Sequence, residues 1–240
     1  MTESIRLSKR LSSQLGCSRS ESVKYIENGY VHVDGAIVDE PGFHVQDEQV
    51  IELASQAQLE APVDVTFLFN KPAGYDVESR FKSGLPIIQS DNHAVDDRSP
   101  NRFIKRHLKE LKLSAPLGRL SGGLVVLTQD WRIARKLKDD ANKIEQEYII
   151  TVSGEMLPDG LKLLNTAAAN MSSHVSIKAS WQSENKLRFA IKGVKRNDIA
   201  SMCAKVGLSV VEMKRIRLGR IPLSTIAEGK WRFLLNQEQF

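Results

Sequence analysis

Hydrophobic residues at helical spacing mark the beginning of the chain. Leu7, Leu11 and Leu15 recur every four positions, which places them on one face of a helix. A second helix is predicted after Ser18, because Glu21 stands three positions later and the two residues form the pattern of a capping box. Two short helices in succession are therefore expected here.

Alternating hydrophobic residues follow and predict short strands. The segment YVHVDGAIV alternates and turns at Asp34-Gly35, a dipeptide typical of hairpins. FHVQDEQVIEL continues as further short strands, and ASQAQLEAPVD is polar, rich in alanine and carries one proline, as linkers do. We expect a small domain over residues 1–55, a linker over 56–64 and a larger domain over 65–240.

The larger domain mixes both kinds of pattern. VTFLFNKPAG, GLVVLT, EYIITVSGE, SIKASWQS and KLRFAIKGV predict strands, while DWRIARKLKDDA and NDIASMCAKVG predict helices. A further helix is predicted in NRFIKRHLKELKL, with Phe103, Ile104, Leu108 and Leu111 facing inward. The expected fold class is α+β, with the larger domain built around a mixed, largely antiparallel sheet.

The distribution of charge along the chain indicates more about its partners than the net charge of +5 does. Acidic residues of the small domain lie mainly in its strand half. The predicted helices carry five basic residues, namely Arg6, Lys9, Arg10, Arg19 and Lys24. This layout suits a phosphate backbone, and a solvated helix face is the alternative. The same two interpretations apply to the cations of the later predicted helix, namely Arg102, Lys105, Arg106, Lys109 and Lys112.

Composition excludes several classes of protein. No segment approaches about 18 uninterrupted apolar residues, so no membrane span is expected, and the charged N-terminus lacks the apolar core of a signal peptide. Cys17 and Cys203 are too few for a disulfide framework and suit the reducing cytoplasm. No Cys/His spacing suggests a metal. No cofactor is expected, and nothing in the sequence demands more than a monomer.

The front of the chain resembles the S4-type RNA-binding domain. The segment RLSKRLSSQLGCSRSESVKYIENGYVHVDGAIV matches the pattern SR-x-E-x-x-x-x-I-x-x-G-x-V-x-V-x-G almost throughout. In that family the paired helices grip structured RNA, which would give the five basic residues of the predicted helices their role. RNA of this kind is recognised mostly by shape and phosphate contacts.

The larger domain resembles the RsuA-type pseudouridine synthases, which carry the same S4-type domain in front. Four segments appear in the right order: NKPAG, GRL with GLVVLT, EQEYIITVSG, and the run from MCAKVG to EGKWR. The resemblance covers nearly the whole chain and favours members that modify large-subunit ribosomal RNA. It implies a pseudouridine-synthase-like fold and an enzyme whose catalytic aspartate attacks a uridine flipped out of the RNA.

The catalytic aspartate of that family is missing. The family pattern is Gly-Arg-Leu-Asp, two residues, Ser or Thr, one residue and Gly-Leu, whereas here Gly118–Leu120 runs directly into Ser121–Leu124. Ser121 is expected at the family's hydroxyl position. A serine hydroxyl is a weak nucleophile without an adjacent base. Asp76 and Asp130 are the substitute carboxylates that the sequence offers, and both are weak candidates.

A second loss accompanies the first. A family motif resembling RQIRRM supplies an arginine that pairs with the catalytic aspartate. Here the matching run is KRNDIASMC, with Ala200 and Ser201 where the arginines would fall. Losing both partners is physically consistent, because a buried charge left alone would be strongly destabilising, on the order of several kcal/mol.

Other pocket residues of the family have counterparts. Tyr148 aligns with the tyrosine that stacks against the target base, and a core tyrosine is the alternative interpretation. Lys71 and Pro72 align with the motif that shapes the neighbouring loop. Arg119 is expected either to contact phosphate or to brace its loop.

These observations favour an RNA-binding protein of synthase ancestry that does not isomerise uridine. Its expected partner is ribosomal RNA or a preribosomal particle. The first alternative is an active ribosomal or transfer RNA pseudouridine synthase that uses a displaced carboxylate. The second is a protein-interaction module outside RNA biology.

Overall fold

The computed structural model describes residues 4–60, 63–167, 175–194 and 196–240. The chain divides into two compact units, and each is described by itself. The first comprises Met1–Asp64 and Asn101–Leu111, and the second comprises Val65–Pro100 and Lys112–Phe240. The segment 101–111, which the sequence assigned to the larger domain, therefore belongs to the first unit.

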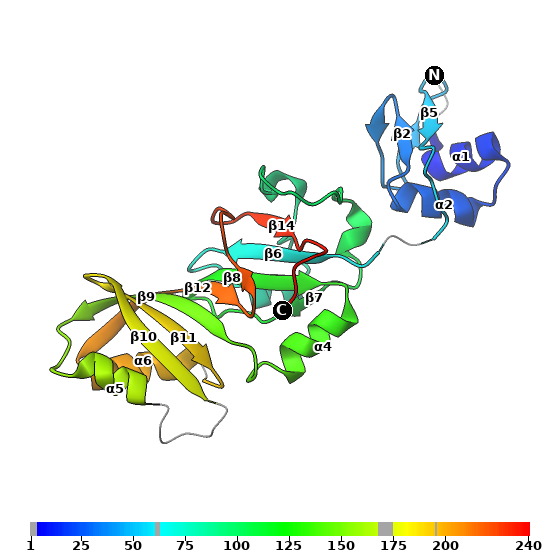
Figure 1. Ribbon diagram of the computed structural model, residues 1–240. Coiled ribbons are helices and arrows are strands. Elements are labelled where there is room, and N and C mark those ends of the chain that lie inside the picture. Colours follow the sequence, from blue (N-terminus) through cyan, green and yellow to red (C-terminus); the bar gives the residue numbers. More distant parts are fainter. Residues whose placement is uncertain (1–3, 61–62, 168–174, 195) are drawn as a thin grey trace. The chain divides into compact units, whose positions relative to one another are not determined.

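The first unit contains two helices and short strands, as the sequence predicted. Their bounds are β1 Ile5–Arg6, α1 Leu7–Leu15, α2 Arg19–Glu27, β2 Val31–Val33, β3 Ala36–Ile37, β4 His44–Val45 and β5 Ile51–Leu53. Strands pair in the order β3-β2-β5, and β1 pairs with β4 (Figure 1). The two helices pack their apolar residues against these strands, with Leu7, Leu11 and Ile26 fully buried.

Local signals placed these elements correctly. The Ser18 hydroxyl accepts a hydrogen bond from the Glu21 backbone N–H at 3.2 Å, and the Glu21 carboxylate accepts one from the Ser18 N–H at 2.8 Å. This is the predicted capping box. The predicted hairpin also forms, with Asp34 at φ 51° and Gly35 at φ 79° between β2 and β3.

The helix predicted over residues 101–112 is wrong. The segment contains only a short 3-10 turn, η2 Lys105–Leu108, before strand β7 Lys112–Ser114 begins. The Lys105 backbone N–H donates to an Asp39 carboxylate oxygen at 2.6 Å, and the Lys105 ammonium pairs with Glu40 at 2.6 Å. Ile104 is buried, as predicted, but the side chain of Leu108 is 40% exposed. Contacts with distant residues of the first unit therefore replace helical hydrogen bonds.

The second unit is built around a sheet of nine described strands, and it has the mixed, mostly antiparallel pairing predicted from the sequence. Its central order is β10-β11-β9-β12-β8-β6-β14, with β13 beside β12 and β7 beside β8 (Figure 1). Only β12 and β8 run parallel among these pairings. The strand bounds are β6 Thr66–Lys71, β8 Ser121–Thr128, β9 Gln146–Gly154, β10 Ser176–Ser183, β11 Lys186–Lys192, β12 Leu208–Leu218, β13 Ile221–Pro222 and β14 Trp231–Phe233.

Short helices connect the strands of this unit. Their bounds are α3 Val77–Lys82, η1 Ser90–Asn92, α4 Trp131–Asp139, α5 Gly160–Thr166 and α6 Arg196–Lys205. Both helices predicted from DWRIARKLKDDA and NDIASMCAKVG are present as α4 and α6.

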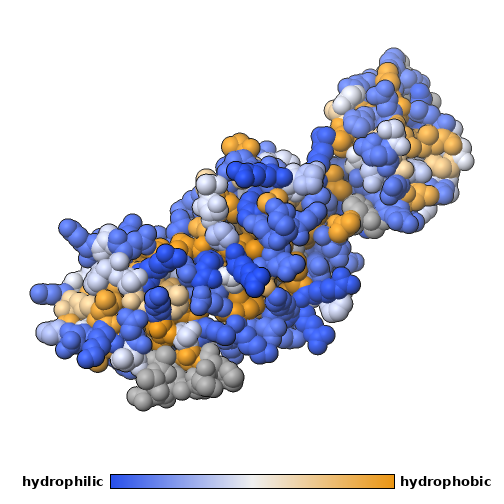
Figure 2. All heavy atoms as spheres, in the orientation of Figure 1, coloured by the Kyte–Doolittle hydropathy of each residue, from blue (hydrophilic) through white to orange (hydrophobic). Residues whose placement is uncertain are grey.

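The face seen in Figure 2 is covered largely by hydrophilic side chains.

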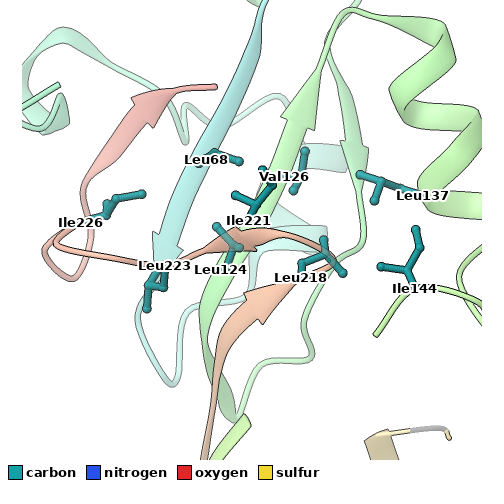
Figure 3. Close-up of a cluster of buried hydrophobic side chains, with 9 residues drawn as sticks. All are labelled: Leu68, Leu124, Val126, Leu137, Ile144, Leu218, Ile221, Leu223 and Ile226. Carbon is teal, nitrogen blue, oxygen red and sulfur yellow. The ribbon is translucent and has the colours of Figure 1, made fainter. Parts of the chain in front are cut away.

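A buried apolar cluster joins α4 to the sheet. It is formed by Leu68, Leu124, Val126, Leu137, Ile144, Leu218, Ile221, Leu223 and Ile226 (Figure 3). Burial of such side chains contributes about 1.5–3 kcal/mol each. The cluster includes residues of β6 and β8, the last residue of β12 and Ile144 just before β9, and the candidate site lies beside it.

Candidate functional site

A buried lysine joins two turns at one side of the site. Lys71, the last residue of β6, is 0% exposed. Its ammonium group donates to the carbonyl oxygens of Pro72 at 2.9 Å, Tyr75 at 2.7 Å and Arg119 at 3.1 Å. A buried cation is tolerated only when its donors are satisfied. Lys71 therefore ties the turn after β6 to the turn before β8.

The shortened motif forms that second turn. The Gly74 N–H donates to the Arg119 carbonyl at 2.8 Å, while the side chains of Arg119 and Leu120 are exposed. Arg119 Nε donates back to the Gly74 carbonyl at 3.3 Å, a contact that braces the loop. Ser121 is 8% exposed and is already the first residue of β8. Its hydroxyl thus belongs to the strand rather than to an open loop.

The glycine pair that follows allows close backbone packing. Gly123 has a φ of +102°, and a Cβ there would lie 2.2 Å from the Arg215 carbonyl oxygen of β12. A Cβ on Gly122 would lie 3.3 Å from the Lys71 carbonyl oxygen. The pair therefore lets β8 run between the backbones of β12 and of the turn after β6.

A cavity of about 320 Å³ lies beside these elements. It is lined by Ala115, Pro116, Leu137, Ala141, Asn142, Ile144, Gln146, Tyr148, Val194, Arg215 and Leu218. Three of these residues, Leu137, Ile144 and Leu218, also belong to the buried cluster and give the cavity an apolar wall (Figure 3). We call this space the tyrosine cavity.

The polar side of the tyrosine cavity is a small hydrogen-bonded network. The Tyr148 hydroxyl donates to Gln146 Oε1 at 2.8 Å, and Arg215 Nη1 donates to the same oxygen at 3.0 Å. Arg215 is 2% exposed, and its Nε donates to the Leu124 carbonyl at 2.8 Å. Because two donors converge on Gln146 Oε1, the Nε2 group of Gln146 is left to donate elsewhere.

Tyr148 lines the cavity and is also well packed, being 2% exposed. Its role in base stacking stays a prediction. Sequence reasoning missed Gln146 and Arg215, although both lie in segments that carried the family resemblance. A charged residue in a strand is normally expected on the solvent side, so no sequence signal indicated the burial of Arg215.

Carboxylates are absent from the described residues that line the tyrosine cavity. Asp76 caps α3, where it accepts from the Ser79 N–H at 2.9 Å. Asp130 caps α4, where it accepts from the Arg132 N–H at 2.7 Å. Both substitute candidates thus have structural roles at helix N-termini. Ala200 and Ser201 are exposed on α6.

The acid next to Tyr148 in the sequence is engaged in ion pairs. Glu147 pairs with Arg217 at 2.6 Å and with Arg188. Burial opposes the ionisation of Glu147, but hydrogen bonds from Arg217 and Arg188 outweigh that effect and lower the pKa of the carboxyl group. Glu147 is therefore held as a paired carboxylate.

Most of the basic residues predicted to face RNA in the first unit are open to solvent. Arg6, Lys9, Arg19 and Lys24 are exposed, whereas Arg10 is half-buried and pairs with Asp47 at 2.9 Å. In the segment 101–111, by contrast, cations are used within the unit. Lys105 pairs with Glu40, Lys109 with Glu27 at 2.8 Å, and Arg106 lies 3.9 Å from Glu27.

The part of the chain that the structure describes offers neither a metal site nor a membrane-spanning helix. It holds no group of three or more His, Cys, Asp or Glu side chains placed to bind a metal ion. None of its helices is long and apolar enough to cross a membrane.

Family comparisons match both parts of the chain. The family described as "S4 domain" matches residues 5–51, and the family described as "RNA pseudouridylate synthase" matches residues 65–211, more than half of the chain. A solved structure described as "Crystal structure of pseudouridylate synthase" shares the fold, with a TM-score of 0.54, 19% identity and coverage of 96% of each chain.

Similar proteins carry related names. An Uncharacterized RNA pseudouridine synthase of Aquifex aeolicus is 26% identical, with 98% of this chain and 94% of that protein covered. The Dual-specificity RNA pseudouridine synthase RluF of Escherichia coli is 28% identical, with 98% and 77% covered. The Ribosomal small subunit pseudouridine synthase A of Salmonella typhimurium is 25% identical, with 98% of each covered.

Proposed function

Since this chain belongs to the RNA pseudouridylate synthase family, we propose that it binds ribosomal RNA through the family's fold but does not isomerise uridine. One observation carries the proposal. The described residues that line the tyrosine cavity include no carboxylate, and the motif that would supply one is shortened between Leu120 and Ser121. Isomerisation needs an acidic group within hydrogen-bond reach of the nucleoside.

Binding of RNA does not need that group. The S4 domain presents Arg6, Lys9, Arg19 and Lys24 to solvent, and such cations hold a phosphate backbone by charge alone. Relatives are named for synthases that act on RNA, including that of the ribosomal small subunit. The proposed partner is ribosomal RNA or a preribosomal particle, and the chain is proposed to bind it as a monomer in the cytoplasm.

The tyrosine cavity supports recognition without chemistry. Its volume of about 320 Å³ falls in the range of small-molecule sites. Gln146 Nε2 is a donor suited to a carbonyl oxygen, and uracil carries two such oxygens. The Arg215 guanidinium is already engaged with backbone carbonyls and with Gln146, so it stabilises the cavity wall.

The main alternative is an active synthase with a displaced carboxylate. Asp76 and Asp130 are the residues that would serve, and each already accepts a helix N-cap hydrogen bond. If either carboxylate acted in catalysis, its N-cap hydrogen bond would break, and the helix would lose about 1 kcal/mol of stability. The turn that carries the carboxylate would also have to move. The structure therefore favours the first function over this one.

The test uses ribosomal RNA labelled with tritium at C5 of uracil, the position that exchanges during isomerisation. The whole chain is expected to release no tritium, because no described group of the cavity can attack the nucleoside. The RluF relative of Escherichia coli, with its own RNA, is the positive control. Release that is abolished by Asp76→Asn or Asp130→Asn would establish the alternative.

A further inference from the structure

A second cavity, of about 500 Å³, is rich in positive charge. It is formed by the end of α4, the loop after it, the end of β11 and the turn after β12. Five cationic residues line it, namely Lys136, Lys143, Lys192, Arg217 and Arg220, against the two acids Asp140 and Glu145. The lining thus carries a net charge of +3. We call this cavity the basic cleft.

Three cations of the basic cleft make no ion pair in the part of the chain that the structure describes, namely Lys136, Lys192 and Arg220, and the Lys136 ammonium group donates instead to the Phe240 carbonyl oxygen. Lys143 pairs with Asp140 at 2.8 Å, and Arg217 pairs with Glu145 and with Glu147. Lys192 and Arg220 have no such partner among the described residues. The acids of the cleft are thereby neutralised, and the charge of Lys192 and Arg220 remains available to a ligand.

The basic cleft and the tyrosine cavity share a wall. Ile144 lines both spaces. Its neighbours alternate between them, since Asn142 and Gln146 line the tyrosine cavity while Lys143 and Glu145 line the basic cleft. A nucleic acid strand bound in one space would therefore lie next to the other.

We propose that the basic cleft binds phosphate groups of an RNA strand, with Lys192 and Arg220 as the contacting residues. This inference rests on the proposed function, which supplies RNA as the partner. Arginine and lysine both suit phosphate oxygens, arginine through paired hydrogen bonds and lysine as a point charge. An acidic protein segment is the competing occupant, but it would leave the nucleobase-sized cavity next door without a role.

The position of this site differs from the one that the sequence indicated for the larger domain. The cations at 105–109 pair with Glu27 and Glu40 of the first unit, so their charge is largely neutralised by these acids. The basic cleft instead gathers residues from α4 to β12 that lie far apart in the sequence. Only the folded sheet brings Lys143, Lys192 and Arg220 to one cavity.

The experiment measures the affinity of the whole chain for deproteinised Escherichia coli ribosomal RNA over a series of salt concentrations. Each phosphate contact contributes about 0.7 to the slope of log K against log salt for a single strand. For the Lys192→Gln/Arg220→Gln variant, the magnitude of this slope is expected to be smaller by about 1.4, because two phosphate contacts are lost. The matched control is Lys138→Gln/Lys162→Gln, which removes two exposed lysines of the same unit outside the cleft and should keep the slope of the unmodified chain.

A slope for the Lys192/Arg220 variant equal to that of the control would overturn the inference while leaving the proposed function intact. Absence of RNA binding by the unmodified chain would overturn both.

Poly-L-glutamate serves as the acidic polypeptide probe. If the variant lost affinity for this probe and kept its affinity for RNA, the cleft would be a protein site and the inference would be wrong. Equal thermal melting of the two variants shows that each is folded.

Discussion

At the scale of single residues, the site depends on two buried cations whose donors are held by backbone carbonyl and side-chain amide oxygens. The Lys71 ammonium is held by three backbone carbonyls, and the Arg215 guanidinium by Leu124 and Gln146. Such cations are stable because their donors are satisfied. They preserve the shape of the site whether or not a carboxylate is present.

The sequence could indicate only some of these residues. Lys71 and Tyr148 were found because they stand in motifs that resemble a known family. Arg215 and Gln146 were not, because their burial follows from the pairing of β12 with both β8 and β9. Arg215 contacts Leu124, which lies 91 positions earlier in the chain. A contact of that range leaves no periodic signal in either strand.

The glycine pair offers a direct test at this scale. A Cβ on Gly123 would lie 2.2 Å from the Arg215 carbonyl oxygen, and the φ of +102° is itself unfavourable for alanine. We expect Gly123→Ala to lower the free energy of unfolding by more than about 4 kcal/mol, measured by urea denaturation. Gly122→Ala is the control, with an expected cost of about 1–2 kcal/mol. Equal effects would show that β8 does not pack as described.

At the scale of elements, local signals predicted the structure correctly where nearby residues decide it and failed where distant contacts decide it. The capping box of α2 and the Asp34-Gly35 hairpin formed as predicted, because each is decided by residues within a few positions. The segment 101–111 looked helical because Phe103, Ile104, Leu108 and Leu111 fall on one face at helical spacing. Its conformation is decided instead by Asp39, Glu40 and Glu27, which lie 65 to 82 positions away.

A buried histidine reports on the docking of this segment. His107 is 5% exposed, and its burial, with the nearby charge of Arg106 as a smaller cause, lowers the pKa of the imidazole from 6.5 to about 4. Between those pH values the unfolded chain binds a proton that the folded chain does not. The free energy of unfolding therefore falls on acidification through this range, by about 1–3 kcal/mol.

The measurement is urea unfolding of the first unit within the whole chain, followed by the NMR signals of α1 and α2 at pH 7 and pH 5. His107→Asn should reduce the loss of stability between the two pH values, since asparagine keeps an acceptor but does not titrate. His44→Asn, at an exposed position, is the matched control and should keep that loss. A His107→Asn variant with the full pH dependence would refute the docking described for residues 101–111.

At the scale of the whole molecule, the S4 domain and the RNA pseudouridylate synthase family point to the same kind of partner. The fold class was predictable because both families have distinctive motifs. The order of strands in the large sheet was not, since the parallel pairing of β12 with β8 joins segments about 90 positions apart. The basic cleft depends on that order, and so it emerged only from the structure.

The front unit should contribute to RNA binding through its exposed cations. Arg19→Glu with Lys24→Glu is expected to weaken binding to ribosomal RNA and to lower the salt slope by at least about 1.4, the loss of two contacts. Both side chains are exposed, so the fold should be unchanged. The comparison is Lys138→Glu with Lys162→Glu, which makes the same change in charge elsewhere. If the two variants bound RNA equally, the exposed cations of the front unit would not contribute to RNA binding.

The central claim is that the chain holds RNA without converting uridine to pseudouridine. The most direct measurement is a map of every pseudouridine in ribosomal RNA from cells that contain this protein and from cells that lack its gene. The two maps are expected to be identical, because the described cavity beside Tyr148 has no carboxylate to act on a nucleoside. A pseudouridine that disappears with the gene and returns with the unmodified protein would contradict the claim.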